Sequence, residues 1–217
     1  MGIIDVTNLS KEFKKKIIFE NVSVSIERGE IFGLIGPSGC GKSVFLRMIM
    51  GFLKQDSGAI KINSILKDPI GFSLQENSIY ENITVKQNLK YFANIYGVRR
   101  KQSKQTISNL IDFLNLRSFE NTLVRKISGG TKKRVDLACA LVKNPEIIIL
   151  DEPLLGLDPQ LVSNFISLIV NLNKQGRTII ITSHMLDEIK PICNRFFMIK
   201  NKNILPVDRN KLALAYE

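Results

Sequence analysis

The stretch IFGLIGPSGCGKSVFL, residues 31–46, decides how the chain folds, because an apolar run changes abruptly into a glycine-rich turn and then into a second apolar run. The pattern G-x-x-x-x-G-K-S starts at Gly36 and ends with Gly41, Lys42 and Ser43. A buried strand, a phosphate-binding loop and a helix follow one another with this spacing. Glycines can turn so that successive N–H groups point into one concavity, and the helix N-terminus adds about half a positive charge. We therefore expect bound phosphate; a tight turn without a ligand is the alternative.

The residues of this loop have distinct expected tasks. Lys42 would reach the β- and γ-phosphates of a nucleotide, and the Ser43 hydroxyl would bind Mg²⁺. The loop residues expected to surround the phosphates are Gly36, Ser38, Gly39, Cys40, Gly41, Lys42 and Ser43.

The composition is that of a globular protein. The 217 residues are 44% hydrophobic and 24% charged, which fits one α/β domain with an insertion. Apolar runs are too short to cross a bilayer, and no leader pattern is found at the N-terminus, so we expect a cytoplasmic protein. The three cysteines are far apart and are expected to be reduced thiols. The net charge of +11 is spread over basic clusters without interleaved aromatic residues, so direct nucleic-acid binding is not expected.

Strands and helices alternate along most of the chain. Segments near residues 3–8 and 17–27 are expected to be strands, as are IGFSL up to the following Gln75, EIIILDEP, RTIIITSH and RFFMIKN. Between them, the spacing of apolar residues becomes helical over about residues 76–127, where Thr84 and Gln87 form a possible capping box.

A further helix is expected after EIIILDEP. Asp158 and Pro159 have the character of an N-cap and a first helical residue, and Gly176 follows Gln175 where a helix would end. Residues 76–127 therefore interrupt an otherwise alternating strand–helix pattern.

The acids at the end of EIIILDEP complete a candidate catalytic site. Strand carboxyl ends meet at one edge of a parallel sheet, so Asp151 could bind Mg²⁺ opposite Ser43. Glu152, aimed differently, could polarise an attacking water. The alternative is that the two acids only cap the following turn.

The chain strongly resembles the nucleotide-binding domain of the ATP-binding cassette (ABC) family. KISGGTKKR, residues 126–134, is similar to the LSGGQ signature of that family. The resemblance implies a P-loop NTPase (RecA-like) α/β core with a small antiparallel β-subdomain and an inserted α-helical subdomain. It implies a single domain over residues 1–217, with the core at 1–75 and 128–217 and the helical subdomain at about 76–127. The implied ligands are ATP and Mg²⁺.

The resemblance also implies roles for individual residues. Phe13 would stack on adenine, and Gln75 would contact Mg²⁺ or the attacking water. Lys42, Glu152 and His184 would be catalytic, although a lone histidine after an apolar strand is more often structural. Metal ligands would be Ser43, Gln75 and Asp151; contacts to the nucleotide of the opposite subunit would come from Ser128, Gly129, Gly130 and Asp158.

Four positions depart from the family pattern. Val44 stands in place of a threonine, which leaves only its backbone N–H for the phosphates, and Thr131 replaces a glutamine. Leu154 and Leu155 occupy the place of a polar pair. We expect these changes to affect the periphery and dimer contacts, and so turnover, while the catalytic residues are retained.

The implied partners are a second ABC ATPase subunit, identical or related, and a separate transmembrane permease at the cytoplasmic face of the membrane. The permease would dock near the segment from Gln75 to Tyr80. SIYENITVKQNLKYFANIYGV, residues 78–98, resembles family exporters. A soluble ABC ATPase, such as a cluster-assembly subunit, and a nucleotide sensor without turnover are the alternatives.

Overall fold

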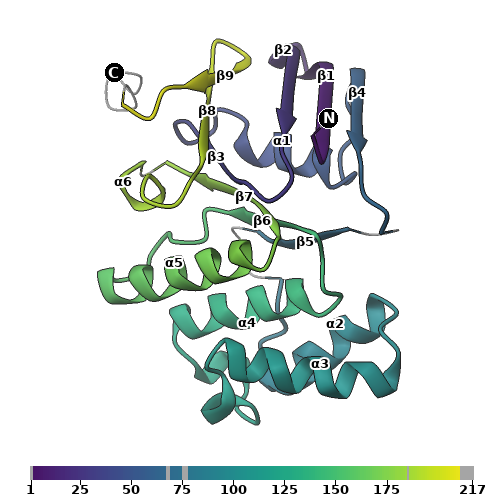
Figure 1. The fold of residues 1–217 in the computed structure, drawn as a ribbon, viewed down its shortest axis with the longest axis vertical. Coiled ribbons are helices and arrows are strands. Elements are labelled where there is room, and N and C mark those ends of the chain that lie inside the picture. The colour runs from purple at the N-terminus through teal and green to yellow at the C-terminus, as the bar shows by residue number, and fades with distance from the viewer. Residues whose placement is uncertain (1, 67–68, 75–77, 185, 211–217) are drawn as a thin grey trace.

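The computed structural model describes residues 2–66, 69–74, 78–184 and 186–210, which form two β-sheets and the helices around them (Figure 1). The strands are β1 (Ile4–Phe13), β2 (Lys16–Ile26), β3 (Ile31–Ile35), β4 (Ser57–Ile62), β5 (Ile70–Ser73), β6 (Ile147–Asp151), β7 (Thr178–Ser183), β8 (Arg195–Lys200) and β9 (Asn203–Val207). The helices are α1 (Lys42–Ile49), α2 (Val85–Ile95), α3 (Arg100–Phe113), α4 (Gly129–Leu141), α5 (Pro159–Lys174) and α6 (Leu186–Ile189), with short 3₁₀ turns η1 (Arg117–Phe119) and η2 (Val124–Lys126).

The larger sheet has six strands in the order β5-β6-β7-β3-β8-β9. Its first five strands are parallel, and β9 pairs antiparallel with β8 at the edge. All residues of β3, β6 and β7 are buried, as expected for central strands covered on both faces. The smaller sheet is antiparallel, with the order β2-β1-β4. The predicted α/β fold, with its P-loop NTPase core and small antiparallel sheet, is confirmed.

Alternate residues of the large sheet enter two different cores. Phe32 and Leu34 of β3 pack with α1 and the small sheet, whereas Ile31 and Ile35 pack on the opposite face, among the helices α2 to α5. Figure 1 shows α1 on the side of the small sheet and α4, α5, α2 and α3 on the other side. The end of β3 is therefore held from both faces, which fixes the position of the loop that follows it.

The helical insertion contains α2, α3, η1 and η2. Its predicted capping box is confirmed: the Thr84 side chain accepts a hydrogen bond from the Gln87 N–H, and the Gln87 side chain accepts one from the Thr84 N–H. The domain boundaries at about residues 76 and 127 stay predictions. None of the helices in the described ranges has the length and apolar composition that crossing a membrane requires.

Several strands differ from expectation. β1 continues to Phe13, well past residue 8, because it pairs with β2 on one side and β4 on the other. β4 and β9 were not predicted: most residues of β4 are exposed, and β9 is an edge strand that contains Pro206. β5 ends at Ser73, and Gln75 lies outside the described residues.

A buried carboxylate joins the end of β5 to α4. Asp136 of α4 is 2% exposed; it accepts hydrogen bonds from the Ser73 hydroxyl and, at 3.1 Å, from the Ser78 N–H. Burial raises the pKa of Asp136, and this effect outweighs the two hydrogen bonds and the charge of Lys133. A raised pKa means that the folded state holds this proton more tightly than the unfolded chain. The contribution of Asp136 to the free energy of unfolding is therefore largest at acidic pH and is lost as pH rises through the folded-state pKa.

Asp136→Asn is expected to keep the free energy of unfolding at or above the wild-type value at neutral pH, and to reduce its decline with pH above the ordinary carboxyl value of 3.8. The amide can accept from the Ser78 N–H and donate to the Ser73 hydroxyl without carrying a buried charge. Asp136→Ala, in contrast, leaves both groups unpaired and should cost about 1–3 kcal/mol. Urea unfolding of both variants at pH 5 and pH 8 measures these differences. Equal destabilisation by both changes would contradict this account.

Candidate phosphate-binding and catalytic site

The loop between β3 and α1 has the backbone that its glycines predict. Gly36 and Gly41 have φ of 154° and 116°. A Cβ on Gly41 would lie 2.9 Å from Ile18 Cγ2, and one on Gly36 would lie 2.7 Å from Cys40 Sγ. The first N–H groups of α1, from Lys42 and Ser43, have no carbonyl partner inside the helix. The loop therefore forms a cradle that ends at a helix N-terminus, an arrangement suited to phosphate.

The Lys42 ammonium lies under this loop. Its Nζ donates to the carbonyl oxygens of Gly36 at 2.8 Å and Pro37 at 3.3 Å, and lies 3.2 Å from Glu152 Oε1. Lys42 is 6% exposed. A buried ammonium needs such partners, because an unpaired charge there would be costly. The positive charge therefore lies beside the N-terminus of α1.

Asp151 is the last residue of β6 and Glu152 follows it, and both are aligned by the neighbouring strand β7. The Thr182 hydroxyl donates to Asp151 Oδ1 at 2.6 Å and accepts from the Glu152 N–H at 2.9 Å. Glu152 has φ of 51°, so the chain turns in the left-handed region directly after Asp151. This turn aims the two carboxylates differently, as the sequence predicted. Thr182, the polar residue near the end of IIITSH, was not identified from the sequence as part of the site.

His184 and Lys42 share the Glu152 carboxylate. His184 Nδ1 is 2.9 Å from Glu152 Oε2, and the backbone N–H of His184 donates to the same oxygen at 3.3 Å. Glu152 Oε1 faces Lys42. The structure therefore brings together Lys42, Glu152 and His184 from the ends of three elements. A carboxylate held between an ammonium and an imidazole can orient a water and accept its proton.

In the KISGGTKKR segment, Lys133 Nζ donates to the Glu152 carbonyl oxygen at 3.3 Å, whereas Ser128 bonds to its own helix. The Ser128 hydroxyl caps α4 by accepting from the Thr131 N–H at 3.3 Å, and Asp158 caps α5 by accepting from the Leu161 N–H at 2.9 Å. Ser128, Gly129 and Asp158 are exposed, whereas Gly130 is buried: a Cβ there would lie 2.6 Å from Leu161 Cδ1. Ser128, Gly129 and Asp158 therefore lie on the surface of the chain, and Gly130 packs beneath them.

The four departures from the family pattern differ in burial. Thr131 is buried, and its hydroxyl lies 3.0 Å from Ser128 Oγ. Val44 is partly buried against the core and Leu154 is 2% exposed, whereas Leu155 is 38% exposed. Their expected effect on dimer contacts and turnover stays a prediction.

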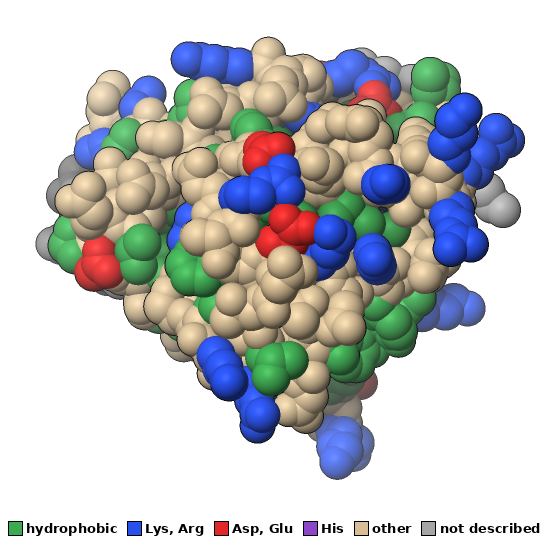
Figure 2. Space-filling view, turned by 90° about the horizontal axis from the view of Figure 1, so that it is seen from below, with side chains coloured by type: hydrophobic (Ala, Val, Ile, Leu, Met, Phe, Trp, Pro, Cys, Tyr) green, Lys and Arg blue, Asp and Glu red, His purple; other side chains and the backbone are tan. Residues whose placement is uncertain are grey.

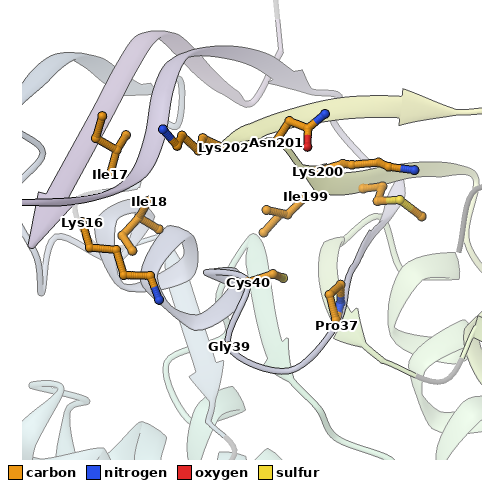
Figure 3. A pocket seen from close by; sticks show the side chains of 11 residues that line it. Lys16, Ile17, Ile18, Pro37, Gly39, Cys40, Ile199, Lys200, Asn201 and Lys202 are labelled. Atoms are coloured by element: carbon orange, nitrogen blue, oxygen red, sulfur yellow. The ribbon is translucent and has the colours of Figure 1, made fainter. Parts of the chain in front are cut away.

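A cavity of about 420 Å³ adjoins the phosphate loop (Figure 3). Figure 3 shows Ile18 of β2, Cys40 of the loop and Ile199 of β8 around it, with Lys16, Lys200 and Lys202 at its margin. Burial raises the pKa of the Cys40 thiol despite the nearby Lys42. The cavity adjoins the loop on the side of β2 and β8, so it has room for a part of a ligand beyond its phosphates.

The predicted residues outside this cluster are placed as follows. Phe13 ends β1 and is 42% exposed. Gln75, predicted as a metal and water ligand, lies outside the described residues. In the described ranges no group of three or more His, Cys, Asp or Glu side chains could hold a metal ion.

Comparison with known proteins gives a consistent result. The model of the family described as "ABC transporter" matches residues 19–155. The chain is 32% identical to the linearmycin resistance ATP-binding protein LnrL of Bacillus subtilis over 213 residues, covering 94% of this chain and 68% of that protein. It is 33% identical to the Nod factor export ATP-binding protein I of Sinorhizobium fredii, covering 91% of this chain and 60% of that protein. It is 33% identical to the ABC transporter ATP-binding protein NatA of B. subtilis, covering 99% and 92%.

Solved structures agree with these relatives. The structure of cbiO1 from Clostridium perfringens, part of an ABC transporter complex, superposes with a TM-score of 0.86 at 27% identity, covering 99% of this chain and 91% of that one. A nucleotide-free ATP-binding cassette superposes with a TM-score of 0.85 at 25% identity, covering 99% and 96%.

Proposed function

The chain belongs to the ABC transporter family, and from this premise we propose that it is an ATP-hydrolysing subunit that powers a separate membrane-spanning permease. ATP-binding domains of this family are ATPases in general. The observation that carries the proposal is the Glu152 carboxylate, which lies between Lys42 and His184 beside the phosphate loop.

The residues of the loop would bind the triphosphate. The N–H groups at the start of α1 and the Lys42 ammonium would contact the β- and γ-phosphates. Lys42 would exchange its contacts with Glu152 and the two loop carbonyls for phosphate oxygens. Glu152 would then be free to orient the attacking water and accept its proton, while His184 would hydrogen-bond the γ-phosphate.

The oxygen donors present fit Mg²⁺ better than a softer metal. Mg²⁺ is commonly held by one or two protein oxygens together with substrate phosphates, and the Ser43 hydroxyl and the Asp151 carboxylate are such donors. Asp151 is 3% exposed and is oriented by Thr182. When bound, Mg²⁺ would neutralise charge on the phosphates. Gln75 remains a proposed additional ligand.

A complete site would need a second subunit. Ser128, Gly129, Gly130 and Asp158 are proposed to contact the nucleotide held by the phosphate loop of a partner, which is either another copy or a related ATPase. Two features support this proposal: Ser128 is the N-cap of α4, whose N-terminus suits an anion, and Ser128 and Gly129 are exposed. The two chains would be arranged head to tail.

An export role is the proposed transport direction. LnrL is a resistance protein and the Sinorhizobium protein acts in Nod factor export, although the chain spans only 68% and 60% of their lengths. Tyr80 and Tyr91 are exposed, and their hydroxyls lie 2.9 Å apart at the start of the helical region. These side chains are the proposed contact for a permease segment on the cytoplasmic face of the membrane.

Purification of the tagged chain from detergent-solubilised membranes tests this role. We expect a partner with several apolar segments of about 20 residues to co-purify, and Tyr80→Ala together with Tyr91→Ala to weaken its recovery. A double change on the distant α5 surface, Ser163→Ala with Ser167→Ala, is the control. Recovery of the ATPase only in the soluble fraction, with no membrane protein attached, would contradict the proposal.

A further inference from the structure

The end of the β1–β2 hairpin borders the phosphate loop. Phe13 pairs with Lys16 across the two strands, and Lys11 pairs with Phe19. Directly paired residues lie on the same face of an antiparallel sheet. Phe19 packs against the loop, since a Cβ on Gly41 would lie 3.0 Å from its Cζ. The pairing shifts register between Lys11 and Glu12, but Lys11 Nζ lies over the Phe13 ring, so the two side chains share one side of the hairpin, the side of Phe19.

Lys11 covers one face of the Phe13 ring. Its Nζ lies 5.1 Å from the ring centroid, within the range of a cation–π contact. Lys11 is 8% exposed, an unusual value for a lysine, whereas the ring itself is 42% exposed. One face of the ring is thus occupied by the ammonium, and the remaining exposed area is available to another planar group.

Asp56 holds Lys11 in place. Asp56 Oδ1 accepts from Lys11 Nζ at 2.7 Å, and Oδ2 accepts from the Glu12 N–H at 2.7 Å. The Asp56 N–H donates to the Ser10 carbonyl at 3.0 Å. The hydrogen bond from Lys11 is the main reason why the pKa of Asp56 is lowered. Asp56 therefore bonds to Ser10, Lys11 and Glu12, three successive residues of β1. An isolated surface ion pair has no such additional bonds.

We propose that Lys11 and Asp56 are positioning residues for the base of the bound nucleotide: Asp56 fixes Lys11, and Lys11 fixes the Phe13 ring so that its other face stacks on the purine. This inference rests on the proposed function, because it takes the triphosphate to lie in the phosphate loop. The hairpin end and the phosphate loop border the same cavity, because Lys16, the partner of Phe13, lines it together with Gly39 and Cys40 (Figure 3). A base attached to phosphates in the loop could therefore reach the Phe13 ring. A ring held in its binding orientation loses less freedom when the base arrives, which improves affinity.

The test compares ATP with inorganic tripolyphosphate, which has the phosphates but no base. Lys11→Met keeps the buried stem and removes the charge; it should raise the Kd for ATP by about three- to tenfold and leave the Kd for tripolyphosphate unchanged. Asp56→Asn should shift the ratio of the two Kd values in the same direction. Lys11→Arg keeps the positive charge, so its ratio of the two Kd values should stay close to that of the wild type. Titration calorimetry with Mg²⁺ gives both constants for each full-length variant.

Lys61→Met, on the exposed surface of β4, is the matched control and should change neither constant. Equal weakening of ATP and tripolyphosphate by Lys11→Met, or no change in the ATP constant, would overturn the inference. If Lys11→Met does not fold, Asp56→Asn and Lys11→Arg decide by the same ratio. A wild-type chain that binds neither ligand would instead refute the proposed function.

Discussion

Glu152→Gln is expected to slow ATP hydrolysis by about 100- to 1,000-fold while ATP binding survives. The amide has the size and hydrogen-bonding reach of the carboxylate but cannot take a proton from water. It also removes the negative charge that lies 3.2 Å from Lys42 Nζ. Lys42 is then freer to contact phosphate, so affinity should not fall. With binding intact and the reaction blocked, a dimer with ATP bound should accumulate.

Phosphate release at saturating ATP and Mg²⁺ measures the rate, and light scattering in excess ATP measures the dimer. Glu188→Gln is the matched control, because Glu188 is a partly buried carboxylate whose charge is felt at His184 and Glu152 but which contacts neither Lys42 nor the loop. It should retain near-normal activity. A Glu152→Gln chain that turns over at the wild-type rate, or stays monomeric in excess ATP, would remove Glu152 from the proposed role.

Mixing variants extends this test to the partner subunit. Ser128→Arg should be inactive, because its exposed helix N-terminus would meet the phosphates of the opposite subunit. A mixed dimer of one Ser128→Arg subunit and one Glu152→Gln subunit contains one site in which both Glu152 and Ser128 are intact. An equal mixture should therefore recover about a quarter of the wild-type rate if subunits pair at random. A mixture no faster than its separate components would contradict head-to-tail sharing.

Lys42→Ala is expected to raise the Kd for ATP by about 100-fold or more. The ammonium would make charge-assisted hydrogen bonds to at least one phosphate, and each such bond is worth about 1.5–3 kcal/mol. The change also leaves Glu152 close to the incoming phosphates without its cation, which adds repulsion. Titration calorimetry with ATP and Mg²⁺ measures the constant directly.

Two further variants separate the loss of the Lys42 charge from other effects of the substitution. Lys42→Met keeps most of the buried volume, so a similar loss of affinity in both variants assigns the effect to charge rather than to packing. Lys54→Ala removes a charge from the exposed surface and should leave the Kd unchanged. Unaltered affinity in Lys42→Ala would refute the phosphate-loop assignment.

Local patterns were sufficient to predict the central part of the fold. IFGLI, IIIL and TIIIT are mostly apolar and contain β-branched residues, and each lies in a fully buried parallel strand. The position of the loop could be predicted from its glycines and Lys42, because the conformation of a backbone turn depends mainly on residues next to one another in the sequence. β4 was missed because it is an edge strand that pairs with the distant β1, and most of its residues are exposed. β9 was missed for another reason: it pairs with its neighbour β8 in a hairpin, but it contains Pro206, which disfavours a strand assignment.

The candidate site was predictable in its members but not in its contacts. The positions of Lys42, Glu152 and His184 follow strand ends, so sequence order was enough to expect them near one another. That Lys42 bonds Glu152, or that Thr182 links Asp151 to Glu152, requires the side-chain geometry of neighbouring strands. The link from Asp136 to Ser73 and the one from Asp56 to Lys11 join residues far apart in the chain, and no local pattern indicates either of them.

The order β6-β7-β3 has a consequence for how the protein tolerates change. One strand separates the strand that leads to Glu152 from the strand that leads to the loop, so their spacing is about 10 Å and is fixed by the hydrogen bonds of the sheet. The helices α2 and α3 are not part of the sheet that fixes this spacing. If the proposed permease docks on α2 and α3, substitutions in these helices can alter that contact while the distance between Glu152 and the loop stays constant.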